Sequence, residues 1–251
     1  MPIEELNGIE LYYESHGEGP PIVFLHGAGG NHISWWQQVP HFRERYRCIT
    51  IDHRGFGRST DPAHEDSARF VDDLETLLER LEVERTALVA QSMGGRTAIG
   101  FAVRHPERVS ALVMCDTWGF FDWPELRAEQ EQWREQNPRD LLLRGGIGDK
   151  FGREHPDMVF LYQQVQDLNP PREASTAPSE TSKDDVAALT VPTIFIQGEV
   201  DPLVPPQIIK QVHELIPGSA YIEFPDRGHS VYWEEPQAFN RTLEAFLAKH
   251  P

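Results

Sequence analysis

Short apolar runs alternate along this chain with segments of helical periodicity, and this alternation constrains the fold more than any other feature of the sequence. The runs Pro21–Leu25, Thr86–Ala90 and Val109–Cys115 are almost continuously apolar. Such runs are typical of strands that are buried on both faces of a parallel sheet. Further strands are predicted at Tyr46–Ile51, Pro192–Ile196 and Ala220–Phe224, and an N-terminal hairpin at Ile3–Leu6 and Ile9–Tyr13 around Asn7-Gly8.

The segments between these runs predict helices that cover both faces of the sheet. From Ser67 to Leu81, apolar side chains recur every three or four positions and draw one stripe along a helix. Helices are also predicted at Met93–Arg104, Pro205–Ile216 and Pro236–His250, the last two with proline in the first turn, where its missing N–H does no harm. Strands that alternate with helices indicate an α/β fold around a parallel sheet.

The charge balance limits the partners that the chain is expected to bind. Its 251 residues include 40 acidic and 23 basic ones, which gives a net charge of −17. This charge argues against nucleic acid and anionic membranes as partners, because both repel a negative chain. The sequence contains neither a membrane-spanning apolar run nor a recognisable signal peptide. Cys48 and Cys115 lie in apolar runs and are interpreted as buried free thiols, so we expect a cytoplasmic protein. The sequence makes no prediction of its oligomeric state.

The segment between residues 118 and 185 interrupts the alternation. It is rich in aromatic and charged residues, contains no clear strand and is too long for an ordinary connection. We interpret residues 118–185 as a helical cap, inserted into a core formed by residues 1–117 and 186–251. Ligands of open α/β sheets bind at the carboxyl ends of the strands, where this segment begins. The alternative is a helical excursion that is remote from any site.

A candidate nucleophile lies where a predicted strand meets a predicted helix, in Ala90-Gln91-Ser92-Met93-Gly94. A sharp strand–helix turn exposes its serine above the sheet, and it needs small residues two positions before and after because the backbone passes close to its neighbours. Ala90 and Gly94 meet this need, although Ala90 departs from the strict Gly-x-Ser-x-Gly pattern. Ser92 is therefore the candidate nucleophile.

A serine hydroxyl needs an adjacent base at neutral pH, and the base needs an orienting carboxylate. His229 follows the last predicted strand and is the candidate base, since it lies at the same edge of the sheet as Ser92. Asp201 and Asp116 each follow a strand and are the rival acids. We favour Asp201, because its loop after the penultimate strand leads toward the histidine loop. The chain order Ser92, Asp201, His229 is that of hydrolases built on such a sheet.

Acyl transfer also needs N–H donors for a developing oxyanion. The Met93 amide lies at a helix start, where backbone N–H groups are unpaired. We assign the second donor to Ala28, within the segment HGAGG at residues 26–30. The alternative reading of HGAGG is a phosphate-binding loop, but neither a G-x-G-x-x-G pattern nor a Lys-Ser/Thr pair follows. No Cys/His spacing indicates a metal site, and the expected chemistry requires no cofactor.

Charged and aromatic residues near these segments have structural interpretations. Within DHRGFGRS at residues 52–59, Asp52 and Arg54 are expected to brace the loop rather than to contact a substrate. His26 is expected to hold the HGAGG loop. An apolar acyl pocket is suggested by the aromatic residues Trp35, Trp118, Phe120, Phe121 and Trp123. The alternative is that these side chains pack the cap or a helix.

Together these segments resemble the α/β-hydrolase superfamily. The resemblance rests on HGAGG, DHRGFGRS, AQSMGG, GEVDPLVP and a final GHS, which follow this order over nearly the whole chain. It implies the α/β-hydrolase fold: an eight-stranded, mostly parallel sheet with an antiparallel second strand, helices on both faces and a helical cap after the sixth strand. It also implies Ser92, Asp201 and His229 as nucleophile, acid and base. Because residue 92 is serine, the resemblance to haloalkane dehalogenases and epoxide hydrolases, which use aspartate there, stops at the fold.

Within that superfamily the sequence is similar to cap-bearing esterases, lactonases and cofactor-free haloperoxidase-like enzymes. We therefore predict a serine hydrolase of a small carboxylic ester or lactone. One alternative is carbon–carbon bond hydrolysis, because hydrolases of ring-fission products share the Ser-Met-Gly-Gly elbow. Such enzymes recognise a substrate carboxylate, for which Arg96, Arg127 and Arg144 are candidates. Another alternative is a small-molecule receptor with weak hydrolase activity.

Overall fold

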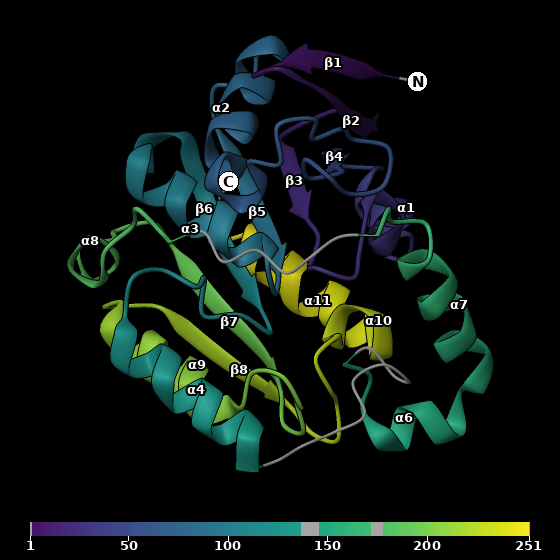
Figure 1. Ribbon diagram of the computed structural model, residues 1–251, viewed down its shortest axis with the longest axis vertical. Helices are drawn as coiled ribbons and strands as arrows, with labels where there is room; N and C mark the ends of the chain where they lie inside the picture. Colours follow the sequence, from purple (N-terminus) through teal and green to yellow (C-terminus); the bar gives the residue numbers. More distant parts are fainter. Residues whose placement is uncertain (1, 137–145, 172–177, 251) are drawn as a thin grey trace.

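The computed structural model describes residues 2–136, 146–171 and 178–250 (Figure 1). Within these residues, eight strands form one sheet in the order β1-β2-β4-β3-β5-β6-β7-β8. The strands are β1 (Ile3–Leu6), β2 (Ile9–His16), β3 (Pro21–Leu25), β4 (Arg47–Ile51), β5 (Thr86–Gln91), β6 (Val109–Cys115), β7 (Thr193–Gly198) and β8 (Ala220–Phe224). Neighbouring strands from β4 to β8 are parallel, whereas β2 is antiparallel to both β1 and β4. The predicted mostly parallel sheet and its antiparallel second strand are confirmed.

The N-terminal hairpin forms where the sequence predicts it. Asn7 and Gly8 have φ angles of +45° and +76°, the left-handed conformation that a two-residue hairpin turn requires. Leu6 pairs with Ile9 directly across the turn. β2 continues to His16, beyond the predicted end at Tyr13, because residues 13–16 also pair with β4. The hairpin thus joins β1 to the edge of the parallel sheet.

The helices predicted at 67–81, 93–104, 205–216 and 236–250 are found close to those ranges, whereas the short helices at 39–42 and 231–234 lie outside the predicted segments. The helices of the described chain are α1 (Val39–Phe42), α2 (Phe70–Arg80), α3 (Gly94–Arg104), α4 (Pro124–Gln136), α6 (Asp149–Glu154), α7 (Pro156–Gln166), α8 (Lys183–Ala187), α9 (Pro206–Leu215), α10 (Val231–Glu234) and α11 (Pro236–Leu247). The predicted helix from Ser67 begins at Phe70, because Asp66–Ala68 form a 3-10 turn. Across the described parts of the chain, no helix is long and apolar enough to cross a membrane.

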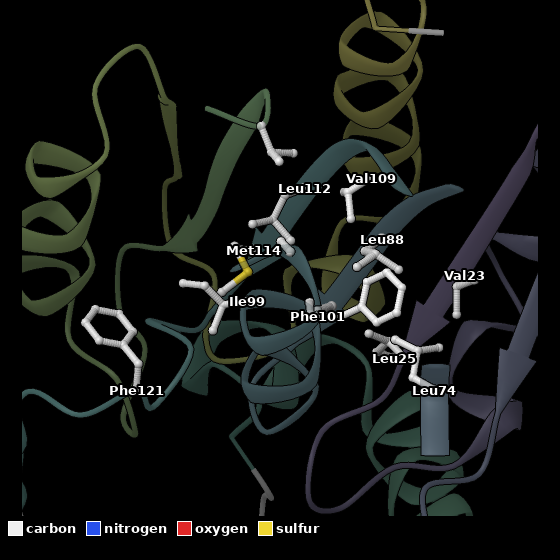
Figure 2. Close-up of a cluster of buried hydrophobic side chains, with 14 of the residues drawn as sticks. Val23, Leu25, Leu74, Leu88, Ile99, Phe101, Val109, Leu112, Met114 and Phe121 are labelled. Carbon is white, nitrogen blue, oxygen red and sulfur yellow. The ribbon is translucent and has the colours of Figure 1, made fainter. Parts of the chain in front are cut away.

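Each face of the sheet buries its own apolar cluster, since successive residues of a strand point to opposite faces. One cluster joins strand residues such as Leu25 and Leu88 to side chains of α2, α3 and α9. Figure 2 shows Leu74 of α2 and Phe101 of α3 in this cluster. The other cluster joins Phe24 and Val89 to α1, α10 and α11. This double burial explains why the central strands are almost continuously apolar.

The segment between β6 and β7 contains α4, α6, α7 and α8. α4 packs beside α9 (Figure 1), where the Gln130 side-chain amide donates to the Leu203 carbonyl at 2.8 Å. α7 lies instead beside α10, with the Tyr162 and Trp233 rings 5.0 Å apart. Helices of this segment therefore contact the core at two separate places.

Arg54 is fully buried and holds the loop after β4 against α2. Its Nε and Nη2 donate to the two carboxylate oxygens of Asp73 at 2.6 and 2.8 Å. Its Nη1 donates to Glu65 at 2.8 Å and to Asp61 at 3.4 Å. The predicted bracing role of Arg54 therefore corresponds to a buried ion-pair network. Asp52 braces the same loop by accepting from the Arg58 amide at 2.9 Å.

We expect Arg54→Ala to lower the free energy of unfolding by about 3–5 kcal/mol, because the buried Asp73 carboxylate loses its cation. Urea denaturation followed by circular dichroism measures this loss. Arg43→Ala is the matched control: its side chain is 53% exposed, and we expect a change within about 0.5 kcal/mol. Equal stabilities of the two variants would contradict the assignment.

Candidate active site

Ser92 lies on a tight turn between β5 and α3. Its φ angle is +48°, a left-handed conformation that costs a non-glycine residue about 1–3 kcal/mol. The Ser92 amide donates to the Cys115 carbonyl at 3.0 Å, which holds the turn against β6. A Cβ at Gly94 would lie 2.3 Å from the Leu25 carbonyl oxygen, so the helix start requires glycine there. Ala90 is buried within β5 and is accommodated at the position where glycine is usual.

The structure brings Ser92, His229 and Asp201 together. His229 Nε2 lies 2.8 Å from Ser92 Oγ, and His229 Nδ1 lies 2.7 Å from Asp201 Oδ2. Because a carboxylate accepts at Nδ1, the neutral imidazole carries its proton there and leaves Nε2 free to accept. This arrangement enables the histidine to take a proton from the serine hydroxyl.

Asp201 is itself held by the loop after β7. Its Oδ1 accepts from the Leu203 and Val204 amides at 2.7 and 2.9 Å, and its Oδ2 accepts from the Gln197 side chain at 3.1 Å. Both Asp201 and His229 are buried. These hydrogen bonds hold the Asp201 carboxylate in the position from which it accepts from His229 Nδ1.

The pKa of His229 reflects two opposing effects. Burial lowers the pKa, since a charged imidazolium is disfavoured away from water. The adjacent Asp201 carboxylate raises it by its charge and its hydrogen bond, and Asp116 adds to this effect. The net result is a pKa above the ordinary value of 6.5.

Asp116, the rival acid, lies beside this arrangement, but its hydrogen bonds are to groups other than His229. Its carboxylate accepts from the Gly198 amide at 2.9 Å, the Val231 amide at 3.2 Å and the Cys115 thiol at 3.2 Å. Burial, with the nearby Asp201 carboxylate, raises the pKa of Asp116 to about 7. The geometry therefore favours Asp201 over Asp116 as the residue that orients the base.

The two predicted oxyanion donors lie beside Ser92. Met93 immediately precedes α3, and Ala28 follows β3 and lines the cavity above the serine. Within the described chain, neither backbone amide donates to a protein acceptor. His26 supports the loop that carries Ala28: its Nε2 accepts from the His53 amide at 3.0 Å. Both amides are thus available to a ligand at Ser92.

A cavity of about 220 Å³ opens at Ser92. The residues that line it are Ala28, Gly29, Gly30, Gln91, Ser92, Gly146, Tyr162, Gln166, Leu203, His229 and Tyr232. It combines apolar surface with a few polar groups, as is usual for small-molecule sites. α7 contributes Tyr162 and Gln166, so part of the segment between β6 and β7 does reach the site.

The five aromatic residues that the sequence suggests for this pocket are not among the residues that line it. Trp118 and Phe121 are fully buried, with Phe120 and Trp123 packed against the same cluster as α3 and α9. Trp35 is buried on the other face, where its ring lies 4.6 Å from Tyr232. These five side chains therefore form core, because their apolar area packs against the sheet and its helices. Tyr162 and Tyr232 are the aromatic residues that line the cavity.

The two candidate arginines that the structure describes, Arg96 and Arg127, also lie outside the cavity lining. Arg96 donates to the Pro178 carbonyl, and burial lowers its pKa. Arg127 lies over the Trp118 ring, 5.8 Å from its centre. Arg144 falls outside the described residues. Neither described arginine is positioned to bind a carboxylate beside Ser92.

Polar residues that sequence reasoning missed hold the loops of the site. Three side-chain amides donate to backbone carbonyls far away in the chain. Gln91 donates to His229 at 2.8 Å. Asn31 donates to Val165 at 2.8 Å, and Asn169 donates to Gly29 at 3.2 Å. The Tyr162 hydroxyl lies 2.9 Å from Ser230 Oγ. Lone Asn and Gln residues carry no spacing signal, so the sequence offers no way to single them out.

Within the described ranges, no group of three or more His, Cys, Asp or Glu residues is arranged to hold a metal ion. Cys48 and Cys115 are both buried and unpaired with each other, as predicted. Burial raises the pKa of the Cys48 thiol to about 12, and burial together with the neighbouring Asp116 raises that of Cys115 well above its usual value. Both thiols are therefore poor nucleophiles and poor metal ligands at neutral pH.

Comparison with known proteins decides the family. A family model described as the alpha/beta hydrolase fold matches residues 20–143 and 149–236. The chain belongs to the α/β-hydrolase family. The resemblance stated from the sequence is thereby confirmed.

Similar α/β hydrolases differ in the reactions that their names describe. The structure of Est816, described as an N-acyl homoserine lactone degrading enzyme, is 30% identical, with a TM-score of 0.83 over 98% of this chain and 100% of that one. A bromoperoxidase structure from Bacillus anthracis is 28% identical, with a TM-score of 0.77 over 96% of each chain. The pimeloyl-[acyl-carrier protein] methyl ester esterase of Vibrio campbellii is 26% identical over 95% of this chain and 98% of its own.

Substitution of the two buried aspartates of this α/β hydrolase, Asp201 and Asp116, is expected to change the reactivity of Ser92 to different extents. We expect Asp201→Asn to slow labelling of Ser92 by a fluorophosphonate about 10³–10⁴-fold, because the imidazole loses the partner that fixes its tautomer. Asp116→Asn is the control, and we expect its rate within about tenfold of the parent, because asparagine resembles the protonated acid. Labelling rates measured by intact-protein mass spectrometry show which of the two aspartates orients His229. A larger loss in Asp116→Asn would reverse the assignment.

Proposed function

We propose that the protein is a serine hydrolase that cleaves small carboxylic esters or lactones through an acyl-enzyme on Ser92. The observation that carries this proposal is the run of hydrogen bonds from Asp201 through His229 to Ser92. Two backbone amides and a cavity of about 220 Å³ lie at its reacting end. A lactone-degrading enzyme and an ester-cleaving enzyme among the similar proteins support the same substrate class.

In the first half of the proposed reaction, His229 Nε2 removes the proton of Ser92 while Oγ attacks the acyl carbon. The carbonyl oxygen becomes an oxyanion, which the Ala28 and Met93 amides stabilise. Asp201 stabilises the imidazolium that forms. The intermediate then collapses: the bond to the alkoxy oxygen breaks, and Nε2 returns the proton to the leaving alcohol. In a lactone, that alcohol stays attached to the acyl group.

In the second half, water takes the place of the alcohol. His229 removes a proton from the water as its oxygen attacks the acyl-enzyme carbonyl. Collapse of the second intermediate breaks the bond to Ser92 Oγ, and the imidazolium returns the proton to the serine. The carboxylic acid leaves, and the starting state is restored without a metal or an organic cofactor.

We propose that residues 118–185 act as a cap over this site, with residues 1–117 and 186–251 as the core. Contacts of α7 and its flanks with the core support this: Tyr162 meets Ser230, and Asn169 meets Gly29. The cavity of about 220 Å³ is smaller than the roughly 300–1,000 Å³ of usual ligand sites, so a short acyl group fits better than a long one. The two buried free thiols support a cytoplasmic location.

Removal of either reacting side chain is the direct test of this mechanism. We expect Ser92→Ala and His229→Ala each to lower kcat for p-nitrophenyl butyrate at least about 10⁴-fold, because the two groups act as a unit. Exposed Ser15 and His41 supply the matched controls Ser15→Ala and His41→Ala, which should retain activity. Substantial turnover by Ser92→Ala would refute the acyl-enzyme.

The pH profile tests the protonation state of the base. His229 accepts a proton only when it is neutral, so kcat/KM rises as pH rises through its pKa. Because the pKa of His229 is raised, we expect the midpoint of this rise above 6.5. Rates with p-nitrophenyl butyrate between pH 5 and pH 9 locate the midpoint. A midpoint below 6.5 would contradict the balance of burial and Asp201 described above.

A substrate panel separates the alternatives. Turnover of short esters or lactones by the isolated protein, over many cycles, supports the proposed class. Preferential cleavage of a vinylogous diketone would instead favour carbon–carbon bond hydrolysis. A single slow turnover that leaves the acyl group on the protein would favour a receptor.

A further inference from the structure

A buried carboxylate that the proposed reaction does not use lies five positions after the base. Glu234 ends α10 and is 4% exposed. Its Oε1 accepts from the Gly148 and Gly228 amides, each at 3.1 Å, and its Oε2 also lies 3.1 Å from the Gly228 nitrogen. Gly228 immediately precedes His229, whereas Gly148 belongs to the segment that leads into α6. Glu234 therefore joins two distant parts of the chain beside the base.

The backbones of these two parts are in direct contact. A Cβ at Gly228 would lie 2.4 Å from the Gly148 nitrogen and 2.5 Å from the Gly146 carbonyl oxygen. A Cβ at Gly148 would lie 2.9 Å from the Gly228 nitrogen. Ordinary carbon contacts lie at about 3.5–4.0 Å, so a side chain at either position would push the segments apart.

The same segment also holds His229 itself. The His229 amide donates to the Gly146 carbonyl at 2.6 Å, and a Cβ at Gly146 would lie 2.8 Å from the His229 Cβ. Gly146 also lines the cavity at Ser92. The segment that contains Gly146 therefore holds the His229 backbone, while Asp201 holds the His229 ring.

We propose that Glu234 is a positioning residue, which fastens residues 146–148 to the loop of the base and so keeps the His229 imidazole at Ser92. The inference rests on the proposed function, because it assigns His229 its role as the base. Glu234 touches neither Ser92 nor the cavity, so it acts through the loop. A carboxylate suits this position because each oxygen can accept more than one hydrogen bond.

The surroundings of Glu234 explain why a glutamine side chain is expected to take over the hydrogen bonds of its carboxylate. Burial raises the pKa of Glu234 to about 7, against the lowering effect of the Gly228 and Gly148 amides. Asp116 raises this pKa further, and Arg227 lowers it. Near neutral pH both protonation states are populated, and both keep an oxygen that accepts from the two amides. Glutamine offers the same oxygen without the charge.

The test measures fluorophosphonate labelling of Ser92, resolved into the maximal rate and the probe concentration at half-maximal rate. We expect Glu234→Ala to lower the maximal rate about 100-fold with a half-maximal concentration within about threefold of the parent, since the base moves while the cavity lining other than Gly146 stays in place. Glu234→Gln should recover the rate to within about tenfold, because its oxygen still accepts both amides. Glu235→Gln is the matched control at the adjacent carboxylate, which pairs with Arg227 and should leave the rate unchanged.

Gly148→Ala provides a second route if Glu234→Ala fails to fold. Gly148 has φ −64° and ψ 141°, which alanine adopts freely, so its Cβ acts by separating the segments. We expect the same loss of maximal rate. The proposal is overturned if Glu234→Ala or Gly148→Ala folds and keeps a rate within about threefold of the parent, or if Glu234→Gln loses as much as Glu234→Ala. Labelling does not depend on ester or lactone turnover, so a failure of the proposed function would be seen separately.

Discussion

The shared direction of β3 to β8 is the constraint on which the rest of this structure depends. Because these strands are parallel, their carboxyl ends lie at one edge of the sheet. The loops that carry Ala28, Ser92, Asp201 and His229 follow β3, β5, β7 and β8 at that edge. Residues about two hundred positions apart, such as Ala28 and His229, therefore meet although no local sequence pattern links them. Helices on both faces stabilise this sheet through the two apolar clusters.

Close approach of backbones is the second requirement of the site. Ser92 adopts a left-handed conformation, and the absence of a side chain at Gly94 lets α3 start against β3. At the other side, a Cβ at Gly198 would lie 2.0 Å from the Gly228 carbonyl oxygen. The loop that carries His229 thus lies tightly against the end of β7. Such preorganisation lets the surrounding groups act without rearrangement during a reaction.

The sheet and its main helices are predictable from the sequence because they follow from local patterns. The convergence at Ser92 is predictable because parallel strands bring the loops that follow them to one edge of the sheet. Continuous apolar runs, a helical stripe and loops after strands are visible without coordinates. The pocket lining was not predictable in this way. Trp118 and Phe121 satisfy any aromatic criterion, yet whether an aromatic ring faces a cavity or the core depends on packing between distant segments. The roles of Gln91, Asn169 and Glu234 were missed for the same reason, since each bonds to a backbone group far away in the chain.

The attachment of α7 to the loop that carries Ala28 has a consequence for thermal inactivation. Side-chain amides of Asn31 and Asn169 make this attachment, and the outer surface of α7 leaves Phe160 62% exposed. Of the eleven residues of α7, only Tyr162 and Val165 are buried, and helices that bury few side chains open before the global transition. Local melting of α7 would release the Ala28 loop while the sheet remains intact. Heat would then abolish function at a temperature below the one at which the strands unfold.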